Sequence, residues 1–126
     1  MLHTFKKEER LKSKKLIEQL FSEGQAETAY PLKLIYFKVK HDGPYPIQAG
    51  FSVMKRKIKK AAHRNRIKRL LREAYRKHKY LVYDQVRASY IFMFLYLDEN
   101  EEKYVVLEGK MIDLLKKFIS KTGKHP

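Results

Sequence analysis

The first apolar pattern along the chain has the spacing of a helix. Ser13 is a residue type that often caps a helix N-terminus, and Gly24 is one that often ends a helix. The apolar residues between them fall on one face at about 100° per residue, and they are Leu16, Ile17, Leu20 and Phe21. We therefore expect a short amphipathic helix between Ser13 and Gly24.

Two segments with strand character follow this helix. Residues 32–40 (LKLIYFKVK) are rich in β-branched and aromatic side chains and partly alternate, and residues 47–54 (IQAGFSVM) form the second segment. The residues between them, 41–44 (HDGP), have the composition of a turn. We therefore expect these two strands to pair as a hairpin with a long loop.

The longest helical pattern covers residues 60–80. Its apolar stripe, which must pack on the sheet, consists of Ile67, Leu70, Leu71, Ala74 and the ring of His78. Residues 89–97 (SYIFMFLYL) come next and are apolar on both faces. That pattern is typical of a central strand that is covered on both sides.

A final helix is predicted to follow the acidic residues 98–102 (DENEE). These residues form a loop that runs into the first turn of the helix, where carboxylates favour the helix dipole. The helix reaches about residue 120, and its inward side chains are Leu107, Met111, Leu114, Leu115 and Phe118.

The predicted order is α-β-β-α-β-α, which indicates the α+β class and a small two-layer α-β sandwich. The chain has 126 residues, of which 44% are hydrophobic, so it can bury a core of its own. It contains no internal repeat and no low-complexity linker. We therefore expect residues 1–126 to form a single domain.

The charge of the chain narrows its function. There are 29 Lys and Arg against 14 Asp and Glu, a net charge of +15, which attracts polyanions. No apolar run approaches the roughly 20 residues of a membrane span, and residues 1–7 lack the apolar middle region of a secretory signal. There is no cysteine, which excludes thiolate chemistry. We expect a cytoplasmic protein that binds nucleic acid.

Positive charge is concentrated on the predicted helix 60–80 and the residues before it. From Lys55 to Lys79 there are 13 Lys and Arg and one acid, Glu73. The helix face opposite the apolar stripe carries Asn65, Lys68, Arg69, Arg72, Arg76 and Lys79, flanked by Arg64 and Arg66. Like charges at i,i+4 destabilise a helix by roughly a few tenths of a kcal/mol per pair, so this face indicates polyanion binding. The opposite face is needed for the core and is not available for lipid.

Residues 51–76 (FSVMKRKIKKAAHRNRIKRLLREAYR) resemble the signature of bacterial ribonuclease P proteins. In that family a strand ending in Ser-Val leads into a Lys-rich loop, and the next helix opens with Arg-Asn-Arg and further basic residues at fixed spacing. The chain departs from the pattern at Lys59, where many members have glycine, and at Ile17, where an aromatic residue is common. The matching residues are Arg64, Asn65, Arg66, Lys68, Arg69 and Arg72.

This resemblance implies a left-handed β-α-β crossover around the basic helix and a role as the protein subunit of ribonuclease P. In that enzyme an RNA subunit is catalytic and holds Mg²⁺, which hydrolyses the 5′ leader from precursor tRNA. The implied partners are therefore the catalytic RNA and precursor tRNA. The chain itself would be a monomer within the ribonucleoprotein, with no catalytic or metal-binding residue and no membrane partner.

The resemblance also implies two groups of site residues. The RNA-binding residues would be Lys55, Arg56, Lys57, Lys60, Arg64, Asn65, Arg66, Lys68, Arg69, Arg72 and Arg76. The cleft for the single-stranded leader would be lined by Ile17, Phe21, Ile35, Tyr36 and Phe37. Aromatic faces stack on unpaired bases regardless of sequence, although each of these rings fits a hydrophobic core equally well. The sequence leaves open whether Tyr36 or Phe37 faces the cleft.

Two other functions are compatible with a small basic protein. A nuclease that works without RNA would need its own acids, bases or metal ligands, and its best cluster is Asp98, Glu99, Glu101 and Glu102. Such a run before a helix is usually a solvated loop, and the five His residues have no metal-binding spacing. A ribosomal or other structural RNA-binding protein fits charge and size as well as ribonuclease P does, and the Arg-Asn-Arg motif separates the two.

Overall fold

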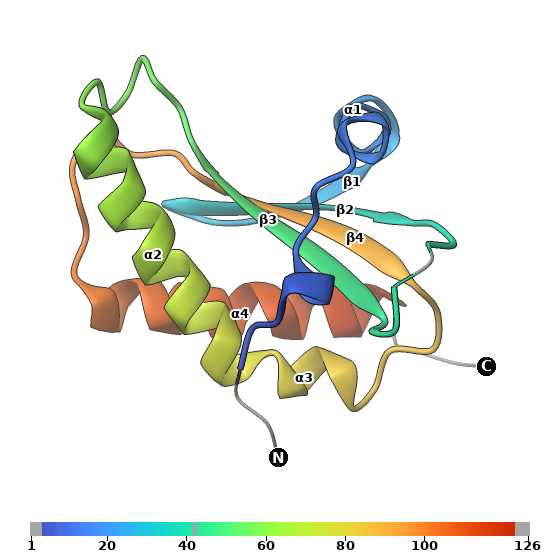
Figure 1. Cartoon of the computed structure of the whole chain (residues 1–126). Helices are drawn as coiled ribbons and strands as arrows, with labels where there is room; N and C mark the ends of the chain where they lie inside the picture. Colours follow the sequence, from blue (N-terminus) through green and yellow to red (C-terminus); the bar gives the residue numbers. More distant parts are fainter. Residues whose placement is uncertain (1–3, 42, 123–126) are drawn as a thin grey trace.

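The structure, a computed structural model, describes residues 4–41 and 43–122 and contains one mixed sheet with helices on both faces (Figure 1). Each predicted helix and strand is present, with bounds close to those expected. The elements in chain order are the 3₁₀ helix η1 (Lys7–Glu9), α1 (Lys14–Glu23), β1 (Gln25–Ala29), β2 (Leu32–Lys38), β3 (Ile47–Val53), α2 (Ala61–His78), α3 (Tyr80–Tyr83), β4 (Tyr90–Tyr96) and α4 (Tyr104–Thr122).

The sheet has the strand order β1-β2-β4-β3, and this order corrects the predicted hairpin. Strand β2 pairs with β1 and β4, both antiparallel, and it does not pair with β3, which is parallel to β4. The hairpin partner of β2 is β1, whose polar sequence QAETA carries no apolar signal. The α+β class is confirmed, and β3 and β4 are joined by a β-α-β crossover through α2 and α3.

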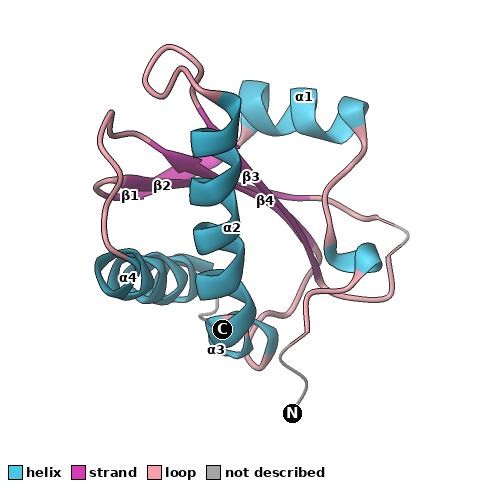
Figure 2. Cartoon of the chain, turned by 60° about the vertical axis from the view of Figure 1, so that its left-hand side comes forward, coloured by secondary structure: helices cyan, strands magenta, loops and turns pink. Residues whose placement is uncertain are grey.

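The main core lies between the sheet and helices α2 and α4, which cover the same face (Figures 1 and 2). All five inward residues predicted for α4 are fully buried. On α2, Ile67, Leu71 and Ala74 are buried as predicted, but Leu70 is only half-buried and Tyr75 completes the stripe instead. Strand β4 is buried on both faces along nearly its whole length, as its sequence predicts.

Helix α1 lies on the opposite face of the sheet, where it covers β2 and β4 (Figure 2). The Ser13 side chain accepts a hydrogen bond from the Leu16 amide at 3.2 Å, which confirms the predicted N-cap. Gly24 ends the helix with extended backbone angles, φ −72° and ψ 159°. A Cβ atom there would lie 2.4 Å from the Leu20 carbonyl oxygen and 2.8 Å from Ile35, so close packing requires the glycine.

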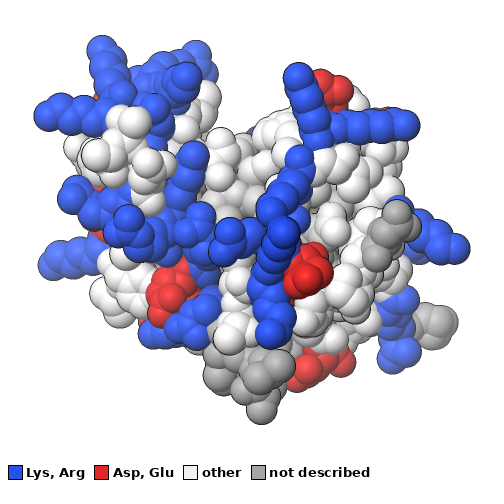
Figure 3. Space-filling view, in the orientation of Figure 1, with Lys and Arg blue, Asp and Glu red and all other residues white. Residues whose placement is uncertain are grey.

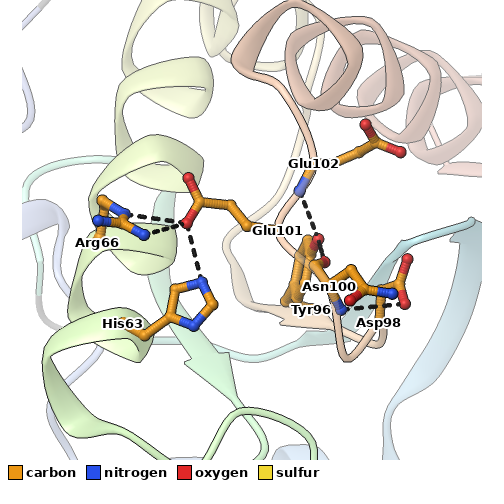
Figure 4. Close-up of polar contacts among 7 residues, drawn as sticks. All are labelled: His63, Arg66, Tyr96, Asp98, Asn100, Glu101 and Glu102. Carbon is orange, nitrogen blue, oxygen red and sulfur yellow. Dashed lines mark hydrogen bonds and ion pairs between the residues drawn. The ribbon is translucent and has the colours of Figure 1, made fainter.

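The acidic residues 98–102 form an ordered loop before α4. The predicted loop is present, but it ends before the helix: α4 begins at Tyr104 and has no acid in its first turn, so the expectation that the loop runs into that turn is wrong. The Asp98 carboxylate accepts a hydrogen bond from the Glu99 amide at 2.7 Å. The Tyr96 hydroxyl accepts one from the Glu102 amide at 3.0 Å. These bonds give the loop a defined conformation and hold Glu101 in a fixed place beside α2 (Figure 4).

The buried ring of Phe118 provides a test of this core. It contacts the rings of Tyr36, Tyr90 and Phe92 at centroid distances of 5.0, 4.9 and 4.8 Å. Phe118→Ala should lower the free energy of unfolding by about 3–5 kcal/mol, because it leaves a cavity and removes apolar contacts. The matched control is Val105→Ala on the same helix, where the side chain is 68% exposed and the expected change is within about 0.5 kcal/mol. Equal effects in urea unfolding would contradict this description of the core.

Candidate nucleic-acid interface

Helix α2 presents its charged face to solvent along one side of the molecule. Lys and Arg side chains gather over α2 and the loop before it, and the surface is hollowed between this region and α1 (Figure 3). The buried residues Ile67, Leu71, Ala74 and Tyr75 fix the rotation of the helix against the sheet. The cations at other positions of the helix therefore face outward as a group.

The N-terminus of α2 is unusual for a surface helix. Its first turn contains no acid, and its N-cap residue, Lys60, makes no side-chain capping bond. A helix N-terminus carries partial positive charge and favours anions, so cations placed there are unfavourable without a partner. An anion placed beside this turn would relieve the local conflict.

The basic loop between β3 and α2 is anchored from within. Amides of Lys57 and Ile58 donate to the Met54 carbonyl at 3.1 Å, and the buried Ile58 side chain holds the loop to the core. This arrangement leaves Lys55, Arg56 and Lys57 exposed. Lys59 fits in place of a glycine, since no described residue has a positive φ.

Arg64 has an internal role in this loop. Its Nη1 atom donates to the carbonyl oxygens of Ile58 at 2.9 Å and of Lys59 at 2.7 Å. The guanidinium therefore closes the loop onto the first turn of α2. Its neighbour Asn65 is exposed on the outer face of the helix, next to the loop.

Arg66 is held by Glu101 from the acidic loop, together with His63 (Figure 4). The Arg66 Nε and Nη2 atoms lie 2.9 and 2.8 Å from Glu101 Oε1, and His63 Nε2 lies 2.9 Å from the same oxygen. Hydrogen bonds from Arg66, reinforced by its charge and that of His63, lower the pKa of the Glu101 carboxyl despite partial desolvation. One carboxylate thus orients two side chains at the start of α2.

The middle of α2 carries its least compensated charge. Among the described residues, no acid forms an ion pair with Lys68, Arg69 or Arg72. Arg72 lies over the Phe51 ring, 5.9 Å from its centroid. Burial, followed by the charges of Arg10 and Arg69, lowers the pKa of the Arg72 guanidinium. Three cations that repel one another are therefore held on one surface, which suits phosphate binding.

The end of α2 is different, because Arg76 and the C-cap residue Lys79 pair with acids. Arg76 donates to both carboxylate oxygens of Glu73, at 3.1 and 2.6 Å. Lys79, which the helical spacing predicts on the exposed face, is only 6% exposed and forms an ion pair with Glu9. The prediction for Lys79 is wrong because α2 ends at His78, and the N-terminal segment covers the next residue.

The structure shows which side of the sheet each aromatic residue of β2 faces. Ile35 and Phe37 point toward α1 and pack with Ile17, whereas Tyr36 points into the main core and is 4% exposed. Tyr36 is therefore removed from the predicted cleft, because alternate residues of a strand face opposite sides. Phe21 on α1 is 51% exposed and stands beside this face.

The basic residues of the N-terminal segment lie beside α2, although the sequence does not predict them as part of the RNA-binding surface. Arg10 and Lys12 line a hollow of about 190 Å³ together with Gly50, Phe51 and Arg72. The signal was present in residues 6–15 (KKEERLKSKK), a second basic run. Its proximity to α2 depends on a bridge between Arg10 and Ala49 of β3, which no local pattern predicts.

Neither a metal centre nor a membrane span is found in the described part of the chain. No group of three or more His, Asp or Glu side chains in residues 4–41 and 43–122 is arranged to hold a metal ion. Within the same residues, no helix is both long enough and apolar enough to cross a bilayer.

Comparison with known proteins gives one consistent result. The profile of the family described as Ribonuclease P matches residues 5–119. The ribonuclease P protein component of Porphyromonas gingivalis is 39% identical over 87 residues, covering 68% of this chain and 63% of the relative. That of Chlorobium phaeobacteroides is 40% identical over 82 residues, covering 62% and 56%. The matched region thus spans less than two thirds of these relatives.

Solved structures show the same fold. The RNase P protein of Thermotoga maritima superposes with a TM-score of 0.69 at 22% identity, covering 86% of this chain and 96% of that one. The RNase P protein of Staphylococcus aureus also has a TM-score of 0.69, at 18% identity, with coverage of 92% and 98%. The arrangement of α2 against the four-stranded sheet is therefore shared despite low identity.

The contact between Arg66 and Glu101 can be tested by titration. Arg66→Gln should raise the pKa of the Glu101 carboxyl toward its ordinary value, because the principal hydrogen bonds to the carboxylate are lost. NMR titration of the carboxyl carbon measures this shift. A folded-state pKa below the unfolded value means that the contact stabilises at neutral pH and is lost as the pH falls through the folded pKa. Arg69→Gln, which changes an exposed arginine on the same helix, is the control, and equal pKa values in both variants would refute the assignment.

Proposed function

The chain belongs to the ribonuclease P protein family, and from this premise we propose that it is the protein subunit of ribonuclease P. In this role it binds the catalytic RNA and the 5′ leader of precursor tRNA and assists the cleavage that gives the mature tRNA 5′ end. The observation that carries the proposal is the family match over residues 5–119, which includes an Arg-Asn-Arg motif at the exposed start of α2. The proposal places the protein in the cytoplasm as a monomer within a ribonucleoprotein.

The contacts of each residue support a division of labour on the RNA-binding surface. Lys68, Arg69 and Arg72 are suited to bind phosphates directly, because no described acid neutralises them. The exposed loop residues Lys55, Arg56, Lys57 and Lys60 extend the same surface. Arg64 shapes the loop, Arg66 is oriented by Glu101, Asn65 is exposed between them, and Arg76 stands at the margin with Glu73.

The leader cleft is proposed beside α1, where this helix lies against the sheet, and the basic loop between β3 and α2 separates it from the charged face of α2. Its exposed ring is Phe21, and the side chains of Ile17, Ile35 and Phe37 provide apolar contacts at its base. A single strand needs a surface of this kind, because unpaired bases gain from stacking on rings while their phosphates gain from nearby cations. The hollow between α1 and the basic loop gives such a strand a path across the sheet (Figure 3).

Catalysis in this proposal belongs to the RNA subunit, which holds most of the Mg²⁺. The described residues do not fit a protein metal site, since they contain no suitable group of carboxylates and imidazoles. The contribution of the chain is to neutralise phosphates and to position the leader. Both actions reduce the electrostatic repulsion between the catalytic RNA and precursor tRNA, which are polyanions that must come together.

Salt dependence of RNA binding tests the role of α2. Lys68→Gln, Arg69→Gln and Arg72→Gln in one variant should make the slope of log affinity against log salt shallower by about 2 to 3, since three phosphate contacts no longer release counterions. Arg64 is left in place because it closes the loop. The control removes three lysines from α4, with Lys110→Gln, Lys116→Gln and Lys121→Gln, and should leave the slope nearly unchanged. Equal slopes in the two variants would exclude this face as the RNA-binding surface.

Reconstitution with a bacterial ribonuclease P RNA tests the function itself. The protein alone should not cleave precursor tRNA, and with the RNA it should lower the Mg²⁺ concentration required for cleavage at the mature 5′ end. Gel analysis of the leader and the product measures both. Cleavage by RNA-free protein would overturn the proposal, whereas RNA binding with no effect on cleavage would indicate a structural RNA-binding protein instead.

A further inference from the structure

A buried ion pair joins the N-terminal segment to the end of α2. Glu9 is 1% exposed and Lys79 is 6% exposed, and they are the only buried charged residues in the described part of the chain. The Lys79 ammonium donates to the Glu9 carboxylate, from a position 70 residues away in the sequence, and to the Thr4 carbonyl. The Glu9–Lys79 pair thus fastens residues 4–9 to the helix.

Further hydrogen bonds fix the Glu9 carboxylate in one place. The Tyr83 hydroxyl donates to Glu9 Oε1 at 2.6 Å, and the Lys6 amide donates to Glu9 Oε2 at 2.8 Å. Burial raises the pKa of the Tyr83 phenol, and the nearby Tyr75 and Glu9 add to the effect. Both carboxylate oxygens are therefore occupied.

A buried ion pair contributes little net stability, because desolvation of the two charges offsets their attraction. Its more specific effect is on geometry, since either partner alone would be an unpaired buried charge. Only one position of the N-terminal segment satisfies both Glu9 and Lys79. The pair should therefore be understood through the residues that it holds in place.

Those residues are Arg10, Leu11 and Lys12. Arg10 forms a parallel bridge with Ala49 at the edge of β3, and the Leu11 amide donates to the Ala49 carbonyl at 3.0 Å. The Leu11 side chain enters the small core under α1. Residues 9–11 are thus held in succession by the end of α2, the edge of β3 and the sheet face under α1.

This position brings Arg10 close to Arg72. Both guanidiniums line the same hollow beside Gly50 and Phe51, together with Lys12. Arg10 lies 5.7 Å from the centre of the Phe5 ring, and Arg72 lies 5.9 Å from that of Phe51. Like charges at this site repel, and none of the acids that form ion pairs among the described residues pairs with either arginine. A mobile N-terminal segment would move Arg10 away, so a fixed backbone is needed to keep it there.

We propose that Glu9 is a positioning residue for RNA binding: through its pair with Lys79 it holds Arg10 and Lys12 beside Arg72, so that the N-terminal segment and α2 form one continuous phosphate-binding surface before RNA arrives. The inference rests on the proposed function, because the ligand is the sugar-phosphate backbone of the RNA. A surface that is ordered in advance loses less conformational freedom on binding than one that is ordered by its ligand.

A double-mutant cycle tests the inference on the full chain. Glu9→Ala and Lys79→Ala are combined, so that no buried charge is left unpaired, and Arg10→Gln is made in this background and in the wild type. In the wild type, Arg10→Gln should make the salt slope for ribonuclease P RNA shallower by about 1. In the Glu9→Ala/Lys79→Ala background the same change should have almost no effect, because Arg10 no longer lies at the surface for RNA.

The control cycle uses Lys68→Gln, in the middle of α2, whose effect should be the same in both backgrounds. Loss of the Arg10 effect alone supports the inference, because a general loss of stability would reduce both effects. Hydrogen exchange of the Leu11 amide should also become faster without the Glu9–Lys79 pair. If the alanine variant does not fold, Glu9→Gln/Lys79→Met preserves side-chain size, and a smaller change in the same direction is expected.

The outcomes separate this inference from the function on which it rests. If the wild type does not bind the RNA with a steep salt dependence, both the proposed function and the inference fail. If the wild type binds but Arg10→Gln has the same effect in both backgrounds, only the positioning role of Glu9 is overturned.

Discussion

The contact of α2 with the sheet determines what the charged surface can do. Ile67, Leu71, Ala74 and Tyr75 are fully buried, so the helix cannot rotate without exposing part of the core. A helix that is fixed on one side presents its remaining positions in fixed directions. The cations of α2 therefore form a rigid array, although each side chain taken alone is long and flexible. Rigidity of this kind lets a backbone with regularly spaced phosphates meet several charges at once.

The few acids near this array set its limits. Glu101 orients Arg66 at the start of α2, Glu73 pairs with Arg76 further along, and Glu9 takes Lys79 into the interior. An acid thus holds a cation near each end of α2, whereas among the described residues no acid pairs with Lys68, Arg69 or Arg72 in its middle. In a chain with 29 basic and 14 acidic residues, the placement of acids decides where the field is strongest.

Elements with a strong apolar period could be predicted from the sequence, and those defined by distant contacts could not. Helix α4 and strand β4 could be predicted directly, because the spacing of their apolar residues identifies both the type of element and the side chains that are buried. Strand β1 is polar and lies at the sheet edge, so only its pairing with β2 reveals it. Lys79 has the spacing of an exposed residue and is buried by Glu9, 70 residues away. Alternate residues of β2 face opposite sides of the sheet, so Tyr36 and Phe37 lie on different faces. Which of the two faces α1 depends on a register that only the folded sheet defines.

Each edge strand of the sheet forms a hydrogen bond with a segment outside the sheet. At β3, residues 10–11 occupy hydrogen-bonding positions beside Ala49, and at β1 the Lys117 ammonium donates to the Thr28 carbonyl at 2.7 Å. An open edge is a template on which a strand of another molecule can add, and this is a common route to aggregation. The same N-terminal segment that carries Arg10 therefore also occupies hydrogen-bonding positions at which a strand of another copy could otherwise add.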